Sequence, residues 1–148
     1  MAQARLDFLV FYRGNLVTGF DYIYVKRHEG HAFWQMRDKR QEVKNILDTD
    51  FDYYNPHFNE KGEPFKWRYQ EPWVDMTTSW DDFAQDAMSY INTWMSEYHG
   101  PAHMNASLND EWGVRYKVPG EHDHIVWGLN AFPVNLQNFV AFLYHFGK

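Results

Sequence analysis

Hydrophobic and polar positions near the start of the chain follow the pattern of a β-hairpin. Residues 6–12 and 16–26 are rich in aromatic and β-branched side chains, and Gly14-Asn15 between them is a turn signal. Counting outward from that pair puts on one face Leu9, Phe11, Leu16, Phe20 and Tyr22, and on the other Phe8, Val10, Tyr12, Val17, Ile23 and Val25. Both faces are apolar, so we expect a central hairpin covered on both sides. The cover comes either from the same chain or from a second copy in a homodimer.

The spacing of apolar residues predicts three helices, over about 37–48, 79–98 and 136–146. The second helix has the clearest pattern, with Ser79 in position for an N-cap and Gly100-Pro101 as the stop. Its apolar positions recur at steps of three and four residues: Trp80, Phe83, Ala84, Ala87, Met88, Ile91, Trp94, Met95 and Tyr98. Asn135 is expected to cap the third helix.

Alternation predicts a second hairpin toward the C-terminus. Its first strand alternates Trp112, Val114, Tyr116 and Val118 with Glu111, Gly113, Arg115 and Lys117. Pro119-Gly120 then turns the chain and residues 125–129 form the returning apolar run. A further short strand is expected at 65–70. The prediction is a single globular domain over 1–148 of the α+β class, in which two hairpins and a short strand build an antiparallel sheet and about three helices pack on it.

Composition and charge exclude several classes of protein. The 148 residues include no cysteine, so disulfide scaffolds, thiolate metal sites and cysteine nucleophiles are impossible. We find no signal peptide and no run of about 18 apolar residues, so we expect a cytoplasmic protein without membrane contact. The formal net charge is −6, and residues 71–148 hold 3 Lys and Arg against 10 Asp and Glu. Direct nucleic-acid binding is not expected, because no dense basic stretch occurs.

The histidines are the first candidates for chemistry. In His122-Asp123-His124, an H-x-H spacing on a strand would put both imidazoles on one face, as at the start of a metal site. A solvated loop after the preceding turn is the simpler alternative, since we find no third ligand at a suitable spacing. No serine-nucleophile motif or glycine-rich phosphate loop occurs either. We therefore predict no metal and no cofactor, and we assign no catalytic residue.

Residues 51–73 are unusually rich in aromatic side chains, and three prolines interrupt them. Large rings with polar groups are typical both of protein cores and of interfaces. The alternatives are that these rings complete the core, contact a partner protein, or form a small-molecule or glycan site. Stacking on single-stranded nucleic acid is disfavoured by the small number of basic residues nearby. The candidate partner-binding residues here are Tyr53, Tyr54, Phe58, Trp67, Tyr69 and Trp73.

The polar face of the helix predicted at 79–98 carries carboxylates and no Lys or Arg. Asp81, Asp82 and Asp86 are candidate partner-binding residues, and Glu97 extends the same face. A row of unmatched carboxylates can meet a basic surface, as an inhibitor that imitates the nucleic-acid backbone would, or can simply be solvated.

Two functional hypotheses follow. The first is a small acidic intracellular protein that occupies a partner protein as a regulator or inhibitor, a type that viruses and mobile elements often carry. The second is a small enzyme or ligand-binding domain, with a pocket roofed by 51–73 and floored by the sheet. His122, His124 or His57 would supply the polar chemistry of that pocket.

Overall fold

The structure is a computed structural model that describes residues 6–28, 31–40, 74–102, 104–105 and 108–146, and all that follows refers to these. The strands are β1 (Phe8–Asn15), β2 (Gly19–His28), β3 (His31–Arg40), β4 (Val74–Asp75), β5 (Glu97–His99), β6 (Glu111–Lys117) and β7 (His124–Leu129). The helices are α1 (Trp80–Ile91), which a 3₁₀ turn at Thr77–Ser79 precedes, and α2 (Leu136–His145). The described elements are thus of the predicted α+β class.

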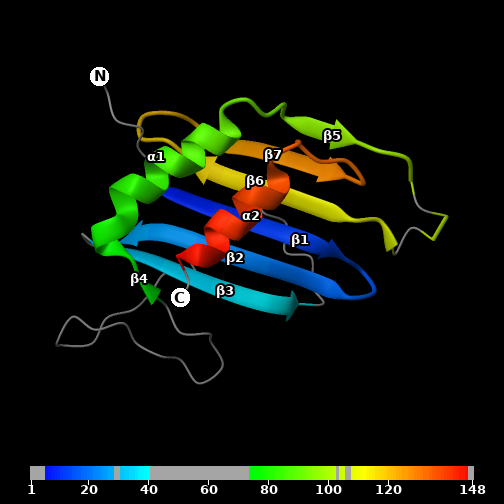
Figure 1. The fold of residues 1–148 in the computed structure, drawn as a ribbon, viewed down its shortest axis with the longest axis horizontal. Coiled ribbons are helices and arrows are strands. Elements are labelled where there is room, and N and C mark those ends of the chain that lie inside the picture. Colours follow the sequence, from blue (N-terminus) through cyan, green and yellow to red (C-terminus); the bar gives the residue numbers. More distant parts are fainter. Residues whose placement is uncertain (1–5, 29–30, 41–73, 103, 106–107, 147–148) are drawn as a thin grey trace.

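The strands form one seven-stranded sheet in the order β4-β3-β2-β1-β6-β7-β5 (Figure 1). Every neighbouring pair is antiparallel except β5 and β7, which run parallel. The sheet is therefore mixed and larger than the two hairpins and short strand that we predicted. The strand expected at 65–70 lies outside the described residues. Two helices, rather than three, lie in the described part of the chain.

Both described helices pack on the same face of the sheet, where they bury the main core (Figure 1). The sheet contributes residues at alternate positions, such as Leu9 and Phe11 of β1, because successive side chains of a strand point to opposite faces. The fully buried large side chains of this core include Phe83, Trp112, Phe139 and Leu143. Burial of each large apolar side chain stabilises the fold by about 1.5–3 kcal/mol.

The opposite face of the sheet carries a second buried cluster. Its members come from β1 and β2: Phe8, Val10, Tyr12, Phe20, Tyr22 and Tyr24. Tyr12, Tyr22 and Tyr24 form a row of stacked rings with centroids about 6 Å apart. Two buried faces on one hairpin agree with the sequence prediction of a hairpin covered on both sides.

The register of the first hairpin differs from the predicted one. Arg13 lies opposite Asp21, because the turn occupies residues 16–18 instead of Gly14-Asn15. The backbone N–H groups of Val17 and Thr18 donate to Asn15 Oδ1, and Gly19 closes the turn at a φ of 86°.

The register shift spans an odd number of residues, so every side chain of β2 changes faces. Ile23 and Val25 therefore join Leu9 and Phe11 under the helices, while Phe20 and Tyr22 join Tyr12 on the other face. The predicted face assignment for β2 was wrong for this reason.

The helix predicted at 37–48 is wrong where the structure describes it. Residues 37–40 belong to β3, whose backbone pairs with β2 along its length. Buried side chains follow one another from Ala32 to Gln35, as expected for a strand covered on both faces. Pairing with a neighbouring strand has overridden the helical spacing of the local sequence. Residues 41–48 lie outside the described part.

Helix α1 is shorter than predicted, since it ends at Ile91 and not near residue 98. Glu97–His99 instead forms β5, which takes its backbone hydrogen bonds from β7. Trp94 still packs on the core, and its Nε1 donates to Asn135 Oδ1 at 2.6 Å. Asn135 thus does not cap α2 with its side chain, and Ser79 makes no capping hydrogen bond to α1.

The predicted second hairpin and the final helix are confirmed. β6 and β7 pair in register around Val114 and Val126, and α2 begins directly after Asn135. Both elements have strong local periodicity, and their apolar residues lie in the main core. The periodic aromatic residues Trp80, Phe83, Trp112 and Phe139 are buried as expected.

Candidate functional site

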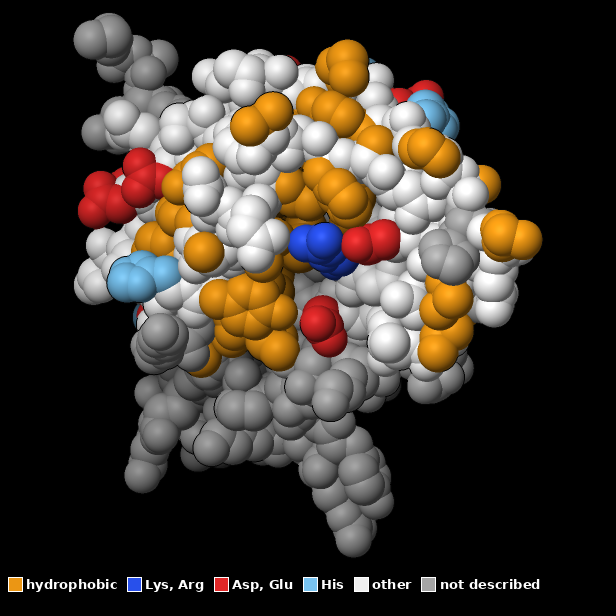
Figure 2. All heavy atoms as spheres, turned by 45° about the vertical axis from the view of Figure 1, so that its right-hand side comes forward, with side chains coloured by type: hydrophobic (Ala, Val, Ile, Leu, Met, Phe, Trp, Pro, Cys, Tyr) orange, Lys and Arg blue, Asp and Glu red, His pale blue; other side chains and the backbone are white. Residues whose placement is uncertain are grey.

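A cleft of about 400 Å³ opens on the helix-covered side of the sheet, at the end where β1 turns into β2. The ends of these strands extend beyond the two helices (Figure 1). The lining residues are Phe11, Arg13, Gly14, Asn15, Thr18, Gly19, Asp21, Asp110, Val140 and Tyr144. Figure 2 looks from this end of the molecule and shows basic and acidic side chains in contact beside hydrophobic ones. The cleft therefore combines a charged part with an apolar wall.

Arg13 is the central charged group of the cleft. Its Nη2 donates to Asp110 Oδ2 at 3.2 Å and its Nε to Oδ1 at 3.5 Å, so the guanidinium engages both carboxylate oxygens. The guanidinium carbon also lies 4.8 Å from the ring centroid of Phe132. About a third of each side chain of the ion pair is exposed, 33% for Arg13 and 37% for Asp110. The pair is thus held in place yet accessible to a ligand.

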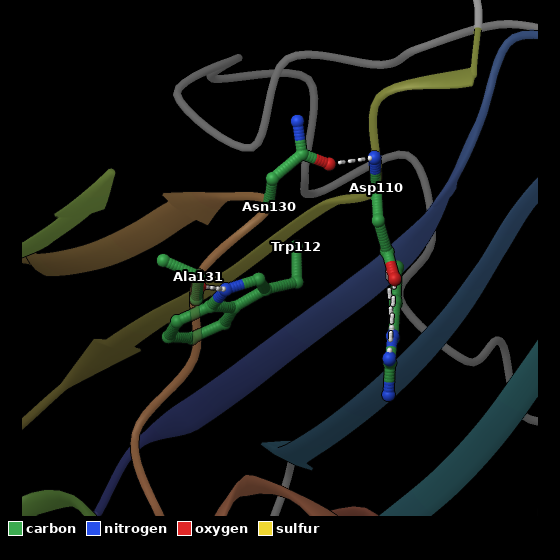
Figure 3. A network of polar contacts seen from close by, with 5 residues as sticks. Asp110, Trp112, Asn130 and Ala131 are labelled. Carbon is green, nitrogen blue, oxygen red and sulfur yellow. Dashed lines mark hydrogen bonds and ion pairs between the residues drawn. The ribbon is translucent and has the colours of Figure 1, made fainter. Parts of the chain in front are cut away.

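Asn130 positions Asp110 (Figure 3). The backbone N–H of Asp110 donates to Asn130 Oδ1 at 2.8 Å, and the backbone N–H of Asn130 donates to the Asp110 carbonyl at 2.8 Å. The Asn130 amide nitrogen donates to the Pro101 carbonyl and to Asn109 Oδ1. Asn130 has a φ of 52°, a conformation that asparagine tolerates better than most residues. These bonds connect the end of β7 to the start of β6.

Trp112 supports the same region from within the core. Its indole N–H donates to the Ala131 carbonyl at 2.8 Å, as Figure 3 shows. Gly128 packs directly against this ring, since a Cβ at Gly128 would lie 2.3 Å from Trp112 Nε1. A close fit between glycine and indole therefore fixes the strand ends from which Asp110 and Asn130 extend.

Glu111 lies next to Asp110 but is in a different environment. It is half-buried, and burial raises the pKa of its carboxyl above the usual range. Burial also raises the pKa of the Tyr12 hydroxyl, and the negative charge of Glu111 adds to this effect. Asp110 is thus paired with a cation, whereas its neighbour in sequence is partly desolvated.

The acidic residues of α1 form a second candidate site, which we call the acidic face and define as Asp81, Asp82 and Asp86. All three are exposed, as predicted, and none forms an ion pair with a described residue. Glu97 is not part of this face, because it lies on β5 and pairs with His99 at 3.4 Å. The candidate contact surface on the helix is therefore shorter than the sequence indicated.

The structure does not form the candidate metal site of His122 and His124 that the sequence suggested. His122 lies in the connection before β7 and only His124 lies on a strand, so the two imidazoles do not share a strand face. His124 stacks on Tyr116 with centroids 5.0 Å apart, and its Nε2 lies 3.3 Å from Glu121 Oε1. Within the described residues, no group of three or more His, Asp or Glu side chains could hold a metal ion.

The remaining candidate residues lie outside the part of the chain that the structure describes: Tyr53, Tyr54, Phe58, Trp67, Tyr69 and Trp73, together with His57. Sequence reasoning also missed Arg13 and Asp110 as a pair, since 97 positions separate them in the chain. The only feature of the local sequence that pointed to them was a polar residue at a strand end: Arg13 near the end of β1 and Asp110 just before β6.

None of the described helices is long and apolar enough to cross a membrane.

The fold is thus an α+β arrangement with two helices on one face of a mixed sheet, and it carries a charged cleft and an acidic helix face. Compared with protein-family models, curated proteins and solved structures, the chain matches none of them.

Proposed function

We propose that this protein is a binding protein that acts by occupying a protein partner, and that the acidic face of α1 is its contact surface. The partner would present a basic surface. Occupying such a surface would block the anionic ligands that it otherwise binds, so a regulatory or inhibitory role follows naturally from the chemistry.

The observation that carries the proposal is the lack of counter-charges on α1. Three other described carboxylates pair with a Lys or Arg of the same molecule: Asp7 with Lys117, Asp110 with Arg13 and Asp123 with Arg115. Glu97 and Glu121 each contact a histidine, His99 and His124. Asp81, Asp82 and Asp86 have none there. Charge that is not neutralised within the molecule remains available to attract another molecule and to speed its association.

The helix also holds these carboxylates in a defined arrangement. Trp80 and Phe83 bury the inner side of α1 in the main core, which fixes the orientation of the outer side. Asp82 and Asp86 are four residues apart, so their Cβ atoms are neighbours about 5–6 Å apart on the helix surface. Asp81 and Asp82 lie in the first turn, where the helix macrodipole favours negative charge. A rigid, solvent-facing anionic surface supports recognition of a basic partner.

The test compares two triple variants that raise the net charge by the same amount. Asp81→Asn, Asp82→Asn and Asp86→Asn together remove the acidic face. Gln137→Lys, Asn138→Lys and Ala141→Lys add the same charge at exposed positions of α2. Tagged wild-type protein and both variants would be used to purify partners from the native cell, and affinity for each captured protein would be measured by calorimetry at several salt concentrations.

We expect the aspartate variant to lose at least about tenfold in affinity for a captured basic protein, together with most of the salt dependence. The α2 variant should retain both. Equal binding by wild type and the aspartate variant would refute the proposal. Equal weakening of the two variants would also refute it, because binding would then depend on net charge and not on the acidic face.

A further inference from the structure

The cleft at the turn end of β1 and β2 shares no lining residue with the acidic face of α1. We propose that it is a second, independent site, which binds a neutral polyhydroxylated small molecule of the saccharide class. Its charge balance, hydrogen-bonding groups, apolar wall and rigidity all suit such a ligand.

The charge balance of the cleft favours a neutral ligand. Arg13 is paired with Asp110, and Asp21 lies opposite Arg13 across the strand pair. A phosphate or carboxylate ligand at the open edge of the guanidinium would lie close to two carboxylates, those of Asp110 and Asp21. A cationic ligand at Asp110 would face the Arg13 guanidinium. Both classes of charged ligand would therefore meet a like charge beside the opposite one, whereas a neutral ligand would not.

The ion pair still offers both donors and acceptors. Asp110 engages Nε and Nη2 of Arg13, which leaves the N–H groups of Nη1 for a ligand. Each carboxylate oxygen of Asp110 can accept a further hydrogen bond. A hydroxyl group donates and accepts at once, so adjacent hydroxyls on a ring can bond to the guanidinium and the carboxylate together. Charged partners make these hydrogen bonds stronger than neutral ones.

The wall of the cleft suits the carbon skeleton of a sugar ring. Phe11, Val140 and Tyr144 contribute apolar surface beside the charged groups, and Thr18 contributes an exposed hydroxyl at the opening. Sugars present C–H groups between their hydroxyls, and these groups pack well against aromatic and aliphatic carbon. A volume of about 400 Å³ lies at the lower end of the range for small-molecule sites, which fits a small saccharide.

The charged groups of the cleft are also already in place. Phe132 lies under the Arg13 guanidinium, Asn130 fixes the backbone of Asp110, and Asn15 closes the turn with two hydrogen bonds. A preorganised site loses less conformational entropy when a ligand binds. This matters for saccharides, because their hydroxyls already bond to water and the net gain per hydrogen bond is small.

Nuclear magnetic resonance titration of the full chain would test the proposal. The probes are the methyl glycosides of glucose, galactose, mannose and N-acetylglucosamine, at up to about 50 mM so that millimolar binding is detected. Glucose 6-phosphate and putrescine serve as the anionic and cationic comparators. We expect at least one neutral glycoside to give saturable shifts at the amides of residues 15–19, Asp110 and Tyr144, with weaker binding of both comparators.

Variants make the result specific to the cleft. Asp110→Asn keeps the backbone bonds to Asn130 and should lose at least about tenfold in affinity, since a charged hydrogen-bond acceptor is removed. Thr18→Trp, at an exposed turn position, should block the opening without altering the core. Asp123→Asn is the matched control, because Asp123 also pairs with an arginine but does not line the cleft.

Three outcomes would overturn the proposal: no saturable shift with any neutral glycoside, tighter binding of glucose 6-phosphate or putrescine, or equal affinity of wild type and the cleft variants. The Asp81, Asp82 and Asp86 triple variant should retain glycoside binding, which separates this site from the proposed partner surface.

Discussion

Helix α1 and the cleft at the turn end of β1 both carry exposed aspartates, but the surroundings of these aspartates differ. Asp110 is paired with Arg13 and its backbone is held by Asn130. Asp82 and Asp86 on α1 have neither a cation nor a hydrogen-bonding network among the described residues. The aspartate in the cleft is therefore neutralised by a cation, whereas the aspartates of α1 keep their negative charge.

This difference predicts two modes of recognition. Unpaired surface charges act over about 8–10 Å at physiological ionic strength, and salt screens them. A paired and partly buried charge contributes little long-range attraction, but it offers strong hydrogen bonds at fixed positions. The acidic face suits a large basic partner, whereas the cleft suits a small ligand that fits a particular pattern of donors and acceptors.

The largest expected effect concerns the inner side of α1, which keeps the acidic face in place. Phe83→Ala should lower the free energy of unfolding by about 3–5 kcal/mol, because Phe83 is fully buried and stacks on Phe142 at 5.3 Å. Gln85→Ala, on the exposed side of the same helix, should change it by less than about 0.5 kcal/mol. Urea denaturation measures both. Similar values for the two variants would show that α1 is not fixed by its core side.

A change behind the cleft should have the next largest effect. Gly128→Ala forces a Cβ to within 2.3 Å of Trp112 Nε1 and should cost about 1–3 kcal/mol of stability. The indole N–H resonance of Trp112 should shift as its hydrogen bond to Ala131 is disturbed. Gly120→Ala is the control: it also introduces strain, at a φ of 83°, but its Cβ meets no atom within 4 Å. An unchanged Trp112 resonance in Gly128→Ala would argue against the close fit.

The pH dependence of stability should distinguish Glu111 from its neighbour Asp110. Burial raises the pKa of Glu111 in the folded protein, so the ionised carboxylate opposes folding. Its unfavourable contribution is absent below the unfolded-state pKa and grows as the pH rises through the folded-state pKa. Glu111→Gln should therefore be more stable than wild type at pH 7, and the difference should disappear toward about pH 3. Denaturation at a series of pH values measures this difference, and a variant less stable than wild type at pH 7 would contradict the prediction.

The smallest effects concern the acidic face itself. Asp86→Asn should stabilise the protein by about 0.2–0.5 kcal/mol, since it removes repulsion from Asp82 four residues earlier. Asp82→Asn removes the same repulsion but also loses a macrodipole interaction of about 0.3–1 kcal/mol, because Asp82 lies in the first turn of α1, so this variant should be less stable than Asp86→Asn. Both differences should vanish in about 1 M salt. Thermal unfolding at low and high salt measures them, and changes that persist at high salt would indicate a short-range contact in place of unpaired charge.

Sequence reasoning succeeded where the hydrophobic pattern is both strong and local. The hairpin of β6 and β7 and the helix after Asn135 were predicted because alternation and helical spacing occur within one continuous segment. It failed at residues 37–40 and 97–98, where helical spacing is present but pairing with another strand, β2 or β7, determines the backbone conformation. The exposure of Asp81, Asp82 and Asp86 was predictable, since it follows from the periodicity of one helix.

The local sequence pattern accounts for the α+β class, for the apolar residues that α1, α2 and β6 contribute to the main core, and for the acidic outer side of α1. Each of these depends on residues within one turn of helix or one strand. The hairpin register, the mixed sheet and the cleft instead depend on how separate strands pair. Asn15 bonds shift the turn and so exchange the faces of β2, and pairing of β1 with β6 brings Arg13 to Asp110. The periodicity of a single segment cannot report which distant strand lies beside it or in which register, and the cleft depends on both.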